Sequence, residues 1–207
     1  MPLLAEHAEL GDPERGASPG EPSDAELIAQ SVSDPAAFTA VFDRHSDEIL
    51  RYAHSRLGPD LAEDVTAETF LAAFRIRNRY DTSRANARPW LYGIAIRQIG
   101  SHQRAEARYR RLLASAPAER TTEDFTDRSA DRVTAASLRP RLIAALEGLR
   151  RTDRELLLLT AWAGLSYEES AIALGLTVSA VKSRLHRVRT KIRAALGNAT
   201  FMNSGEY

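Results

Sequence analysis

The sequence contains no cysteine among its 207 residues. This absence excludes disulfides, thiolate nucleophiles and cysteine-ligated zinc. The chain also lacks a phosphate-binding loop that ends in Gly-Lys-Ser/Thr and a His-Glu-x-x-His pair, and its 5 histidines are scattered without metal-ligand spacing. The segment GLSYE lacks the second glycine of a nucleophile elbow. We therefore predict a protein that is not an enzyme and that uses neither a metal nor another cofactor.

Long apolar runs are scarce as well. The longest one, LLLLTAWAGL from Leu156, is too short to cross a bilayer. The first residues, MPLLAEHAEL, lack the basic region and the sustained apolar run of a signal peptide. Together with the absence of cysteine, these features predict a cytoplasmic protein.

No segment alternates apolar and polar residues convincingly with a period of two, whereas helical spacing recurs along most of the chain. We expect an all-α fold of two small helical domains, the second with a helix-turn-helix, joined by a flexible linker. The expected boundaries are 1–22 for a disordered acidic tail, 23–112 for the first domain, 113–138 for the linker, 139–196 for the second domain and 197–207 for a C-terminal tail.

Helix-start and helix-stop signals punctuate both expected domains. Asp34 followed by Pro35 is typical of a helix start, and further helices are expected over about 61–77 and from Pro89. Capping boxes are predicted at Ser23 with Glu26, Thr152 with Glu155, and Ser166 with Glu169. Gly164 and Gly175 lie where helices should end.

The segment GLTVSAVKSRLHRVRTKIRAAL, from Gly175 to Leu196, carries many cations and no carboxylate, although the whole chain balances 28 Lys and Arg against 28 Asp and Glu. Its apolar residues recur at helical spacing, and the preceding SYEESAIALG completes a helix-turn-helix. A solvated amphipathic helix is the alternative, but such a helix usually interleaves charges of both signs. We therefore predict that this helix binds DNA.

A second basic tract comes at the end of the first domain. Its cations are Arg97, Arg104, Arg108, Arg110 and Arg111, and Trp90, Tyr92 and Tyr109 lie nearby in the sequence. Arginine and aromatic side chains together are typical of single-strand binding, because bases stack on rings while guanidinium groups contact phosphates. The alternative is that Trp90 and Tyr92 belong to the hydrophobic core.

A stripe of the opposite sign lies in DLAEDVTAETFLAAF. Asp60, Asp64 and Glu68 recur every fourth residue, and Ala67, Phe70, Leu71 and Phe74 are expected to form the apolar face. Like charges at this spacing repel one another, and a cationic protein partner would offset that repulsion. A merely solvated face is the alternative.

These segments occur in a recognisable order. AEDVTAETFLAAF, then RPWLYGIAIRQIGSHQRAEARYRR, a linker, and LRRTDRELLLLTAWAGLSYEESAIALGLTVSAVKSRLHRVRTKI resemble the extracytoplasmic-function group of the bacterial sigma-70 family. The resemblance covers about residues 23–196 and implies a sigma-2 domain followed by a sigma-4 domain. It implies an RNA polymerase sigma factor that binds core polymerase and directs promoter-specific initiation.

The resemblance also implies roles for particular residues. Core polymerase, through its beta-prime clamp helices and beta flap, and promoter DNA are the implied partners, and whether an anti-sigma factor also binds is left open. Implied contacts with core polymerase are Asp60, Asp64, Glu68, Phe70 and Leu71. Implied contacts with the minus-ten element are Arg97, Arg104, Arg108, Arg110 and Arg111. Implied contacts with the minus-thirty-five element are Thr177, Ser179, Lys182, Ser183, Arg184, His186 and Arg187.

The rival hypothesis is a stand-alone helix-turn-helix regulator that does not bind core polymerase. Such a regulator shares the basic C-terminal helix but requires neither the acidic stripe nor the arginine-rich helix that precedes the linker.

Overall fold

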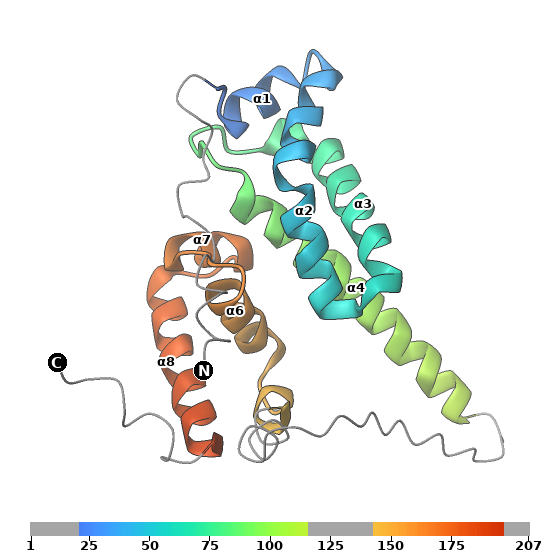
Figure 1. Cartoon of the computed structure of the whole chain (residues 1–207), viewed down its shortest axis with the longest axis vertical. Coiled ribbons are helices and arrows are strands. Elements are labelled where there is room, and N and C mark those ends of the chain that lie inside the picture. The colour runs from blue at the N-terminus through green and yellow to red at the C-terminus, as the bar shows by residue number, and fades with distance from the viewer. Residues whose placement is uncertain (1–20, 116–142, 197–207) are drawn as a thin grey trace, which may run out of the picture.

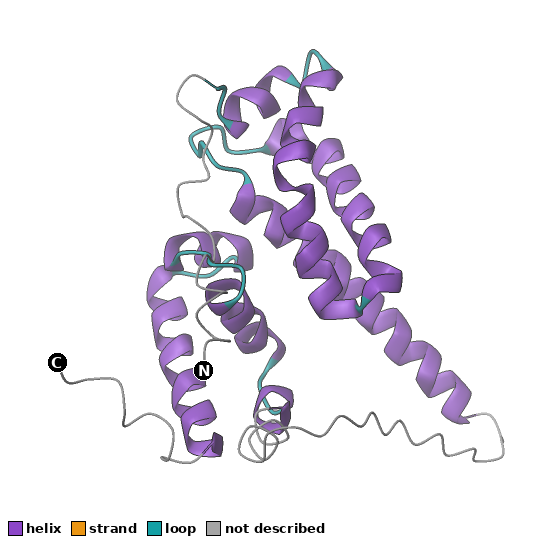
Figure 2. Cartoon of the chain, viewed as in Figure 1, coloured by secondary structure: helices purple, strands orange, loops and turns teal. Residues whose placement is uncertain are grey.

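The described part of the protein is helical throughout. The computed structural model describes residues 21–115 and 143–196 (Figure 1), and no strand occurs in those two ranges (Figure 2). The predicted all-α class is therefore confirmed. Most of the predicted N-terminal tail, all but the start of the predicted linker, and the predicted C-terminal tail lie outside the described residues.

The described helices form two groups. The first group contains α1 (Asp24–Gln30), the 3₁₀ turn η1 (Pro35–Ala37), α2 (Phe38–Leu57), α3 (Pro59–Ile76), the 3₁₀ turn η2 (Arg77–Arg79) and α4 (Arg88–Ser115). The second contains a helical turn over 143–147, α6 (Arg151–Ala161), α7 (Tyr167–Leu174) and α8 (Val178–Leu196).

Most of the predicted helix boundaries are confirmed. Ser23 and Ser166 each make a complete capping box, and the Asp34 carboxylate accepts a hydrogen bond from the Ala36 amide. The box predicted at Thr152 is wrong. The N-cap of α6 is Arg150, whose side chain has no acceptor with which to cap a helix, and the Glu155 carboxylate instead accepts hydrogen bonds from residues of α2.

The core of the first domain lies between α2, α3 and α4. It contains Val41, Ile49 and Tyr52 from α2, Val65 and Ala73 from α3, and Leu91 and Ile99 from α4. One detail of the predicted apolar face of α3 is wrong: Ala67 and Leu71 are exposed, whereas Val65 and Thr69 are buried. The Thr69 hydroxyl donates to the Val65 carbonyl, one turn earlier, at 2.7 Å. This hydrogen bond allows a polar residue to lie in the core.

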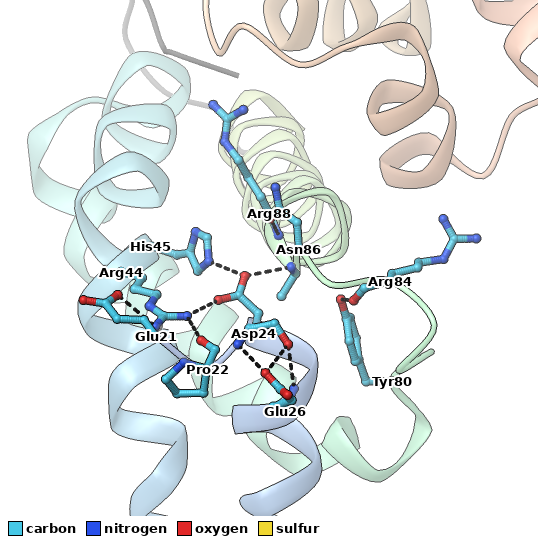
Figure 3. Close-up of polar contacts among 12 residues, drawn as sticks. Glu21, Pro22, Asp24, Glu26, Arg44, His45, Tyr80, Arg84, Asn86 and Arg88 are labelled. Atoms are coloured by element: carbon cyan, nitrogen blue, oxygen red, sulfur yellow. Dashed lines mark hydrogen bonds and ion pairs between the residues drawn. The ribbon is translucent and has the colours of Figure 1, made fainter. Parts of the chain in front are cut away.

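A buried ionic cluster fastens α1 to the other helices (Figure 3). Asp24 accepts hydrogen bonds from His45 at 2.8 Å, from the Ala87 amide at 2.8 Å and from Arg44 at 3.0 Å. The other ring nitrogen of His45 lies 2.8 Å from Glu48, which also accepts from Arg88 at 2.6 Å. The cluster therefore joins α1, α2 and the start of α4 through paired charges.

The second domain packs directly against the first. Its own small core contains Leu156, Ala171, Val181 and Leu185. By contrast, Leu159, Ala163, Leu165 and Ala173 belong to the same hydrophobic cluster as the core of the first domain. Figure 1 shows α6 and α7 beside the first half of α4, so in this structure the two domains share a core.

The protonation of His45 should make stability depend on pH. Burial alone would lower the pKa of His45, but the hydrogen bonds and charges of Asp24 and Glu48 outweigh burial and raise it to about 9. Because folding raises the pKa, protonation of His45 stabilises the folded protein. This contribution is complete below the pKa of the unfolded state, near 6.5, and is lost as the pH rises through about 9. The expected loss is on the order of 3 kcal/mol in the free energy of unfolding. Urea unfolding followed by circular dichroism at pH 6–9 measures it.

His45→Gln is the control for this prediction, because glutamine keeps hydrogen-bonding capacity but does not titrate. Its free energy of unfolding should change less than that of the parent across this pH range. Parallel pH profiles for the two proteins would show that His45 does not carry the pH dependence.

Candidate nucleic-acid and polymerase interfaces

The basic helix α8 presents a polar face to solvent. Thr177, Ser179, Lys182, Ser183, His186 and Arg187 are all exposed, while Val181, Leu185 and Val188 are buried on the opposite side. The Thr177 hydroxyl accepts a hydrogen bond from the Ala180 amide and so caps the start of α8. Short hydroxyl side chains beside long cationic ones allow a helix to approach a groove closely.

Arg184 differs from its neighbours on α8. It is only partly exposed, and its guanidinium donates to Asp153 of α6 at 2.8 Å. An arginine that is held by a carboxylate ties α8 to α6, so we assign Arg184 a role in holding the domain together.

The turn between α7 and α8 sets the helix-turn-helix geometry. Gly175 has a left-handed backbone with φ of 64°, which other residues rarely adopt, and it ends α7 as predicted. The Leu176 amide then donates to the Ala171 carbonyl at 2.8 Å. This turn lets the buried face of α8 pack against α6 and α7 while its polar face stays in solvent.

The arginines of α4 fall on two faces. At about 100° per residue, Arg97, Arg104, Arg108 and Arg111 lie within an arc of about 60° and form one stripe, which we call the arginine stripe. All four side chains are exposed. Arg110 lies outside this arc and donates to Glu106 at 2.8 Å. The arginine stripe therefore excludes Arg110.

The aromatic residues near the arginine stripe do not share its face. Tyr92 is buried in the core, and Trp90 is partly buried with its ring centroid 4.9 Å from that of Tyr80. Tyr109 is 60% exposed, but helical geometry puts it on the opposite side of α4 from Arg104 and Arg111. The predicted combination of stacking rings and arginines is thus not present on one face of α4.

The acidic stripe of α3 faces solvent. Asp60, Asp64 and Glu68 are exposed, and Glu68 lies 2.9 Å from the ring of His102 on α4. Leu71, next to the stripe, is 48% exposed. Phe70 is buried, so it lies beneath this surface and not on it.

Two exposed apolar residues, one on α2 and one on α3, were missed in the sequence. Phe42 is 41% exposed, and its ring packs edge-on against Phe70 at a centroid distance of 4.8 Å. Leu61 is also partly exposed at the start of α3. Phe42 follows the same helical spacing as core residues, and only its place at the edge of the bundle distinguishes it from them.

Two hollows lie between the domains, and neither was predicted. A groove of about 640 Å³ separates the segment before α4 from the helix-turn-helix, and its lining includes Tyr80, Arg84, Trp90, Ile172 and Leu176. A crevice of about 500 Å³ is lined by Gly93, Arg97, Arg151, Glu155 and Ala173, among others. Sequence spacing could not reveal them, because each is formed by segments more than 50 residues apart.

Polar contacts hold the domains together around this crevice. Tyr52 and Arg56 of α2 both donate to the Glu155 carboxylate of α6 at 2.6 Å. Arg88 of α4 donates to the Ala163 carbonyl, and Arg151 of α6 donates to the Ile96 carbonyl at 3.1 Å.

Two features are absent from the described ranges. No cluster of three or more His, Cys, Asp or Glu residues there could hold a metal ion. None of the helices described is both long enough and apolar enough to cross a bilayer.

Comparisons with known proteins identify the two domains. The family Sigma-70 region 2 matches residues 41–109, and Sigma-70, region 4 matches residues 139–192. The ECF RNA polymerase sigma factor SigL of Mycobacterium tuberculosis is 32% identical over 174 residues, which are 83% of this chain and 96% of SigL.

Two solved structures have a similar fold. A structure of CnrH in complex with the cytosolic domain of CnrY is 29% identical, with a TM-score of 0.56, and the match covers 86% of this chain and 99% of that one. The sigma factor RpoE, solved with the anti-sigma factor NepR from Bartonella quintana, shows the same fold at 22% identity and a TM-score of 0.54, over 77% of this chain and 96% of that one.

The family matches decide between the two hypotheses from the sequence. A stand-alone helix-turn-helix regulator would be expected to match region 4 but not region 2. This chain matches both, and the region-2 match covers most of its first domain. The chain belongs to the extracytoplasmic-function group of the sigma-70 family of RNA polymerase sigma factors.

Proposed function

We propose that three separate surfaces carry out the steps of initiation: α3 binds core polymerase, the arginine stripe of α4 binds the minus-ten strand, and α8 binds the minus-thirty-five element. The observation that supports this division is the sorting of exposed charge. The chain as a whole has no net charge, yet α8 contains no carboxylate, five exposed arginines lie on α4, and the exposed Asp60, Asp64 and Glu68 recur along α3.

The exposed face of α8 suits double-stranded DNA. Lys182 and Arg187 can reach phosphates, while Thr177, Ser179, Ser183 and His186 are short enough to approach base edges in the major groove. Arg184 is left out of this surface because Asp153 already binds its guanidinium.

The arginine stripe suits a single strand. Its four guanidinium groups follow the axis of α4, and Figure 1 shows the last part of this helix extending beyond the ends of α2 and α3. A strand that follows the stripe exchanges condensed counterions for arginines, which favours binding without base pairing. Retention of one separated strand is what promoter opening requires.

The acidic stripe and its apolar neighbours suit a cationic protein surface. Asp60, Asp64 and Glu68 supply charge, and the exposed Leu71 and Phe42 supply apolar area, a combination typical of protein interfaces. The clamp helices of the beta-prime subunit are the proposed partner, and Phe70 contributes by supporting Phe42 from below.

Further assignments follow from family membership. We propose that the second domain contacts the beta flap, that an anti-sigma factor binds the chain, and that the protein acts in the cytoplasm without catalysing a reaction itself. The solved complex of RpoE with NepR supports the anti-sigma partner at the level of the fold.

Removal of cations from α8 should weaken promoter binding in a salt-dependent way. Lys182→Ala and Arg187→Ala should each lower the affinity of the holoenzyme for promoter DNA and reduce the slope of log affinity against log salt by about one unit. Lys191→Ala is the control, because Lys191 lies on α8 about 110° from the centre of the proposed face. An unchanged slope in both variants would exclude phosphate contacts by these residues.

Charge reversal on α3 should abolish polymerase binding. Asp64→Lys combined with Glu68→Lys places like charges opposite a cationic partner, which costs several kcal/mol. Pull-down with core polymerase measures binding, and circular dichroism confirms the helical fold. Glu63→Lys is the matched control, since Glu63 is exposed on α3 but lies off the stripe. If the double variant still binds core polymerase, the acidic stripe is a solvated face and not a polymerase contact.

The arginine stripe should be needed for DNA opening and not for polymerase binding. We expect Arg104→Ala, Arg108→Ala and Arg111→Ala together to leave core binding intact and to prevent open-complex formation on a duplex promoter. Each arginine that is removed takes away a phosphate contact that favours the separated strand over the duplex, whereas a promoter that is already unpaired needs no such help to open. A promoter already mismatched across the minus-ten region should therefore recover much of the lost activity.

Permanganate footprinting of unpaired thymines and run-off transcription on both templates test this prediction. Arg110→Ala is the matched control, because Arg110 is on the same stretch of α4 but faces away and pairs with Glu106. If the triple variant opens the duplex as well as the parent does, α4 is not the melting surface.

A further inference from the structure

Lysine is almost absent from this chain, and both lysines lie on α8. Of the 28 lysine and arginine residues, Lys182 and Lys191 are the lysines and all the others are arginines. Both lysine side chains are exposed. The guanidinium of arginine stays protonated, whereas the amine of lysine is a common target of acetylation. The chain therefore offers side-chain amines to an acylating reagent only on the helix that is proposed to bind DNA.

The two lysines face in different directions. At about 100° per residue, Lys182 shares the polar face of α8 with Ser183 and His186. Lys191 lies about 110° from the centre of that face. Figure 1 shows α8 on the outer side of the second domain, away from α2 and α3. Lys182 is therefore open to small reagents in the free protein and would face DNA in the proposed complex.

The amine of Lys182 is not held by another group. Within the described ranges its Nζ atom forms no hydrogen bond and no ion pair. Arg184, two residues later, differs because its guanidinium donates to Asp153. No carboxylate occurs on α8 itself. An amine that is paired with a carboxylate must give up that pair before it can react, and Lys182 has no such pair to give up.

The surroundings of Lys182 suit a phosphorylated acyl donor. The cations of α8 that would attract the phosphates of DNA also attract a small acyl phosphate. His186 follows Lys182 by four residues, a spacing at which two side chains on a helix are neighbours. The ring of His186 forms no hydrogen bond in the described part of the chain, so it can accept the proton that the amine must lose. Lys191 has no histidine three or four residues away.

We propose that Lys182 is a site of acetylation by acyl phosphates, and that this modification weakens binding of the minus-thirty-five element. The proposal rests on the proposed function of α8. The neutral amine attacks the carbonyl carbon of acetyl phosphate, a C–N bond forms, and the bond from that carbon to the phosphate oxygen breaks. The amine proton passes through His186 to the departing inorganic phosphate. The product is a neutral amide, so the positive charge that would contact a DNA phosphate is lost.

Acetyl phosphate itself is the probe. The full chain is treated with it, freed from the reagent and assembled with untreated core polymerase, and promoter affinity is measured over a range of salt concentrations. Mass spectrometry of peptides gives the acetylated fraction of Lys182 and of Lys191. Protein synthesised with acetyl-lysine at position 182 gives the effect at full occupancy. Its affinity should be severalfold lower, and the slope of log affinity against log salt should fall by about one unit.

Each lysine can be removed as a target without loss of its charge. Lys191→Arg should lose promoter affinity on treatment as the parent does, whereas Lys182→Arg should show the same affinity before and after treatment. Each variant is compared with its own untreated sample, so a change in its starting affinity does not enter the comparison. His186→Gln should slow acetylation of Lys182 severalfold relative to Lys191 in the same molecule. An unchanged ratio of the two rates would show that His186 does not take the proton.

The failures of the two proposals are distinguishable. If Lys182→Ala leaves promoter affinity and the salt slope unchanged, Lys182 does not contact DNA and its part in the proposed function of α8 fails. If Lys182→Ala weakens binding but acetyl phosphate does not modify Lys182, the DNA contact stands and the proposed acetylation site is wrong. The same conclusion follows if protein with acetyl-lysine at position 182 binds the promoter as tightly as the parent.

Discussion

The buried carboxylate of Asp24 is the constraint on which the first domain depends. A carboxylate removed from water needs partners that compensate its charge, and Asp24 finds them on two separate segments: Arg44 and His45 of α2 and the backbone at Ala87 just before α4. Loss of Arg44 or His45 would remove one of the two cations that compensate this buried charge. The cluster therefore determines how α1 and the segment before α4 lie against α2.

The same network reaches the second domain. Glu48 binds both His45 and Arg88, and Arg88 donates to the carbonyl of Ala163, just after α6. The position of α4 is thus coupled to the docking of α6 and α7, which also add apolar residues to the core of the first domain. Helix α4, which is proposed to bind DNA, also lies at the contact between the two domains. That double use explains why glycines occur where a stable DNA-binding helix alone would favour alanine.

Charge is sorted by helix face throughout the molecule. Arginines that lie on the proposed DNA faces are exposed, whereas Arg88 and Arg184 are partly buried and bind the carboxylates of Glu48 and Asp153. Arginine can serve both purposes because its planar group is a strong multiple donor and remains charged when partly buried. A count of cations along the sequence cannot separate the two uses.

The sequence alone determined the all-α class, most helix ends and the family, because these depend on local spacing, capping residues and the order of motifs. Ser23, Asp34, Ser166 and Gly175 act on residues within a few positions of themselves, so their effects are readable without a fold. Glu155 shows the limit: it stands at the correct spacing from Thr152 for a capping box, yet the tertiary structure directs it to Tyr52 and Arg56.

Only the tertiary structure decided which members of each predicted site are available to a partner. Phe70 is buried under Phe42, Arg110 turns away from the arginine stripe, and Arg184 is held by Asp153. It also decided that the two domains share a core and that Gly93 and Gly100 lie beneath α7 and α6. These outcomes depend on contacts between residues far apart in the chain, whose free energies are set by burial and charge pairing, and local periodicity carries no information about them.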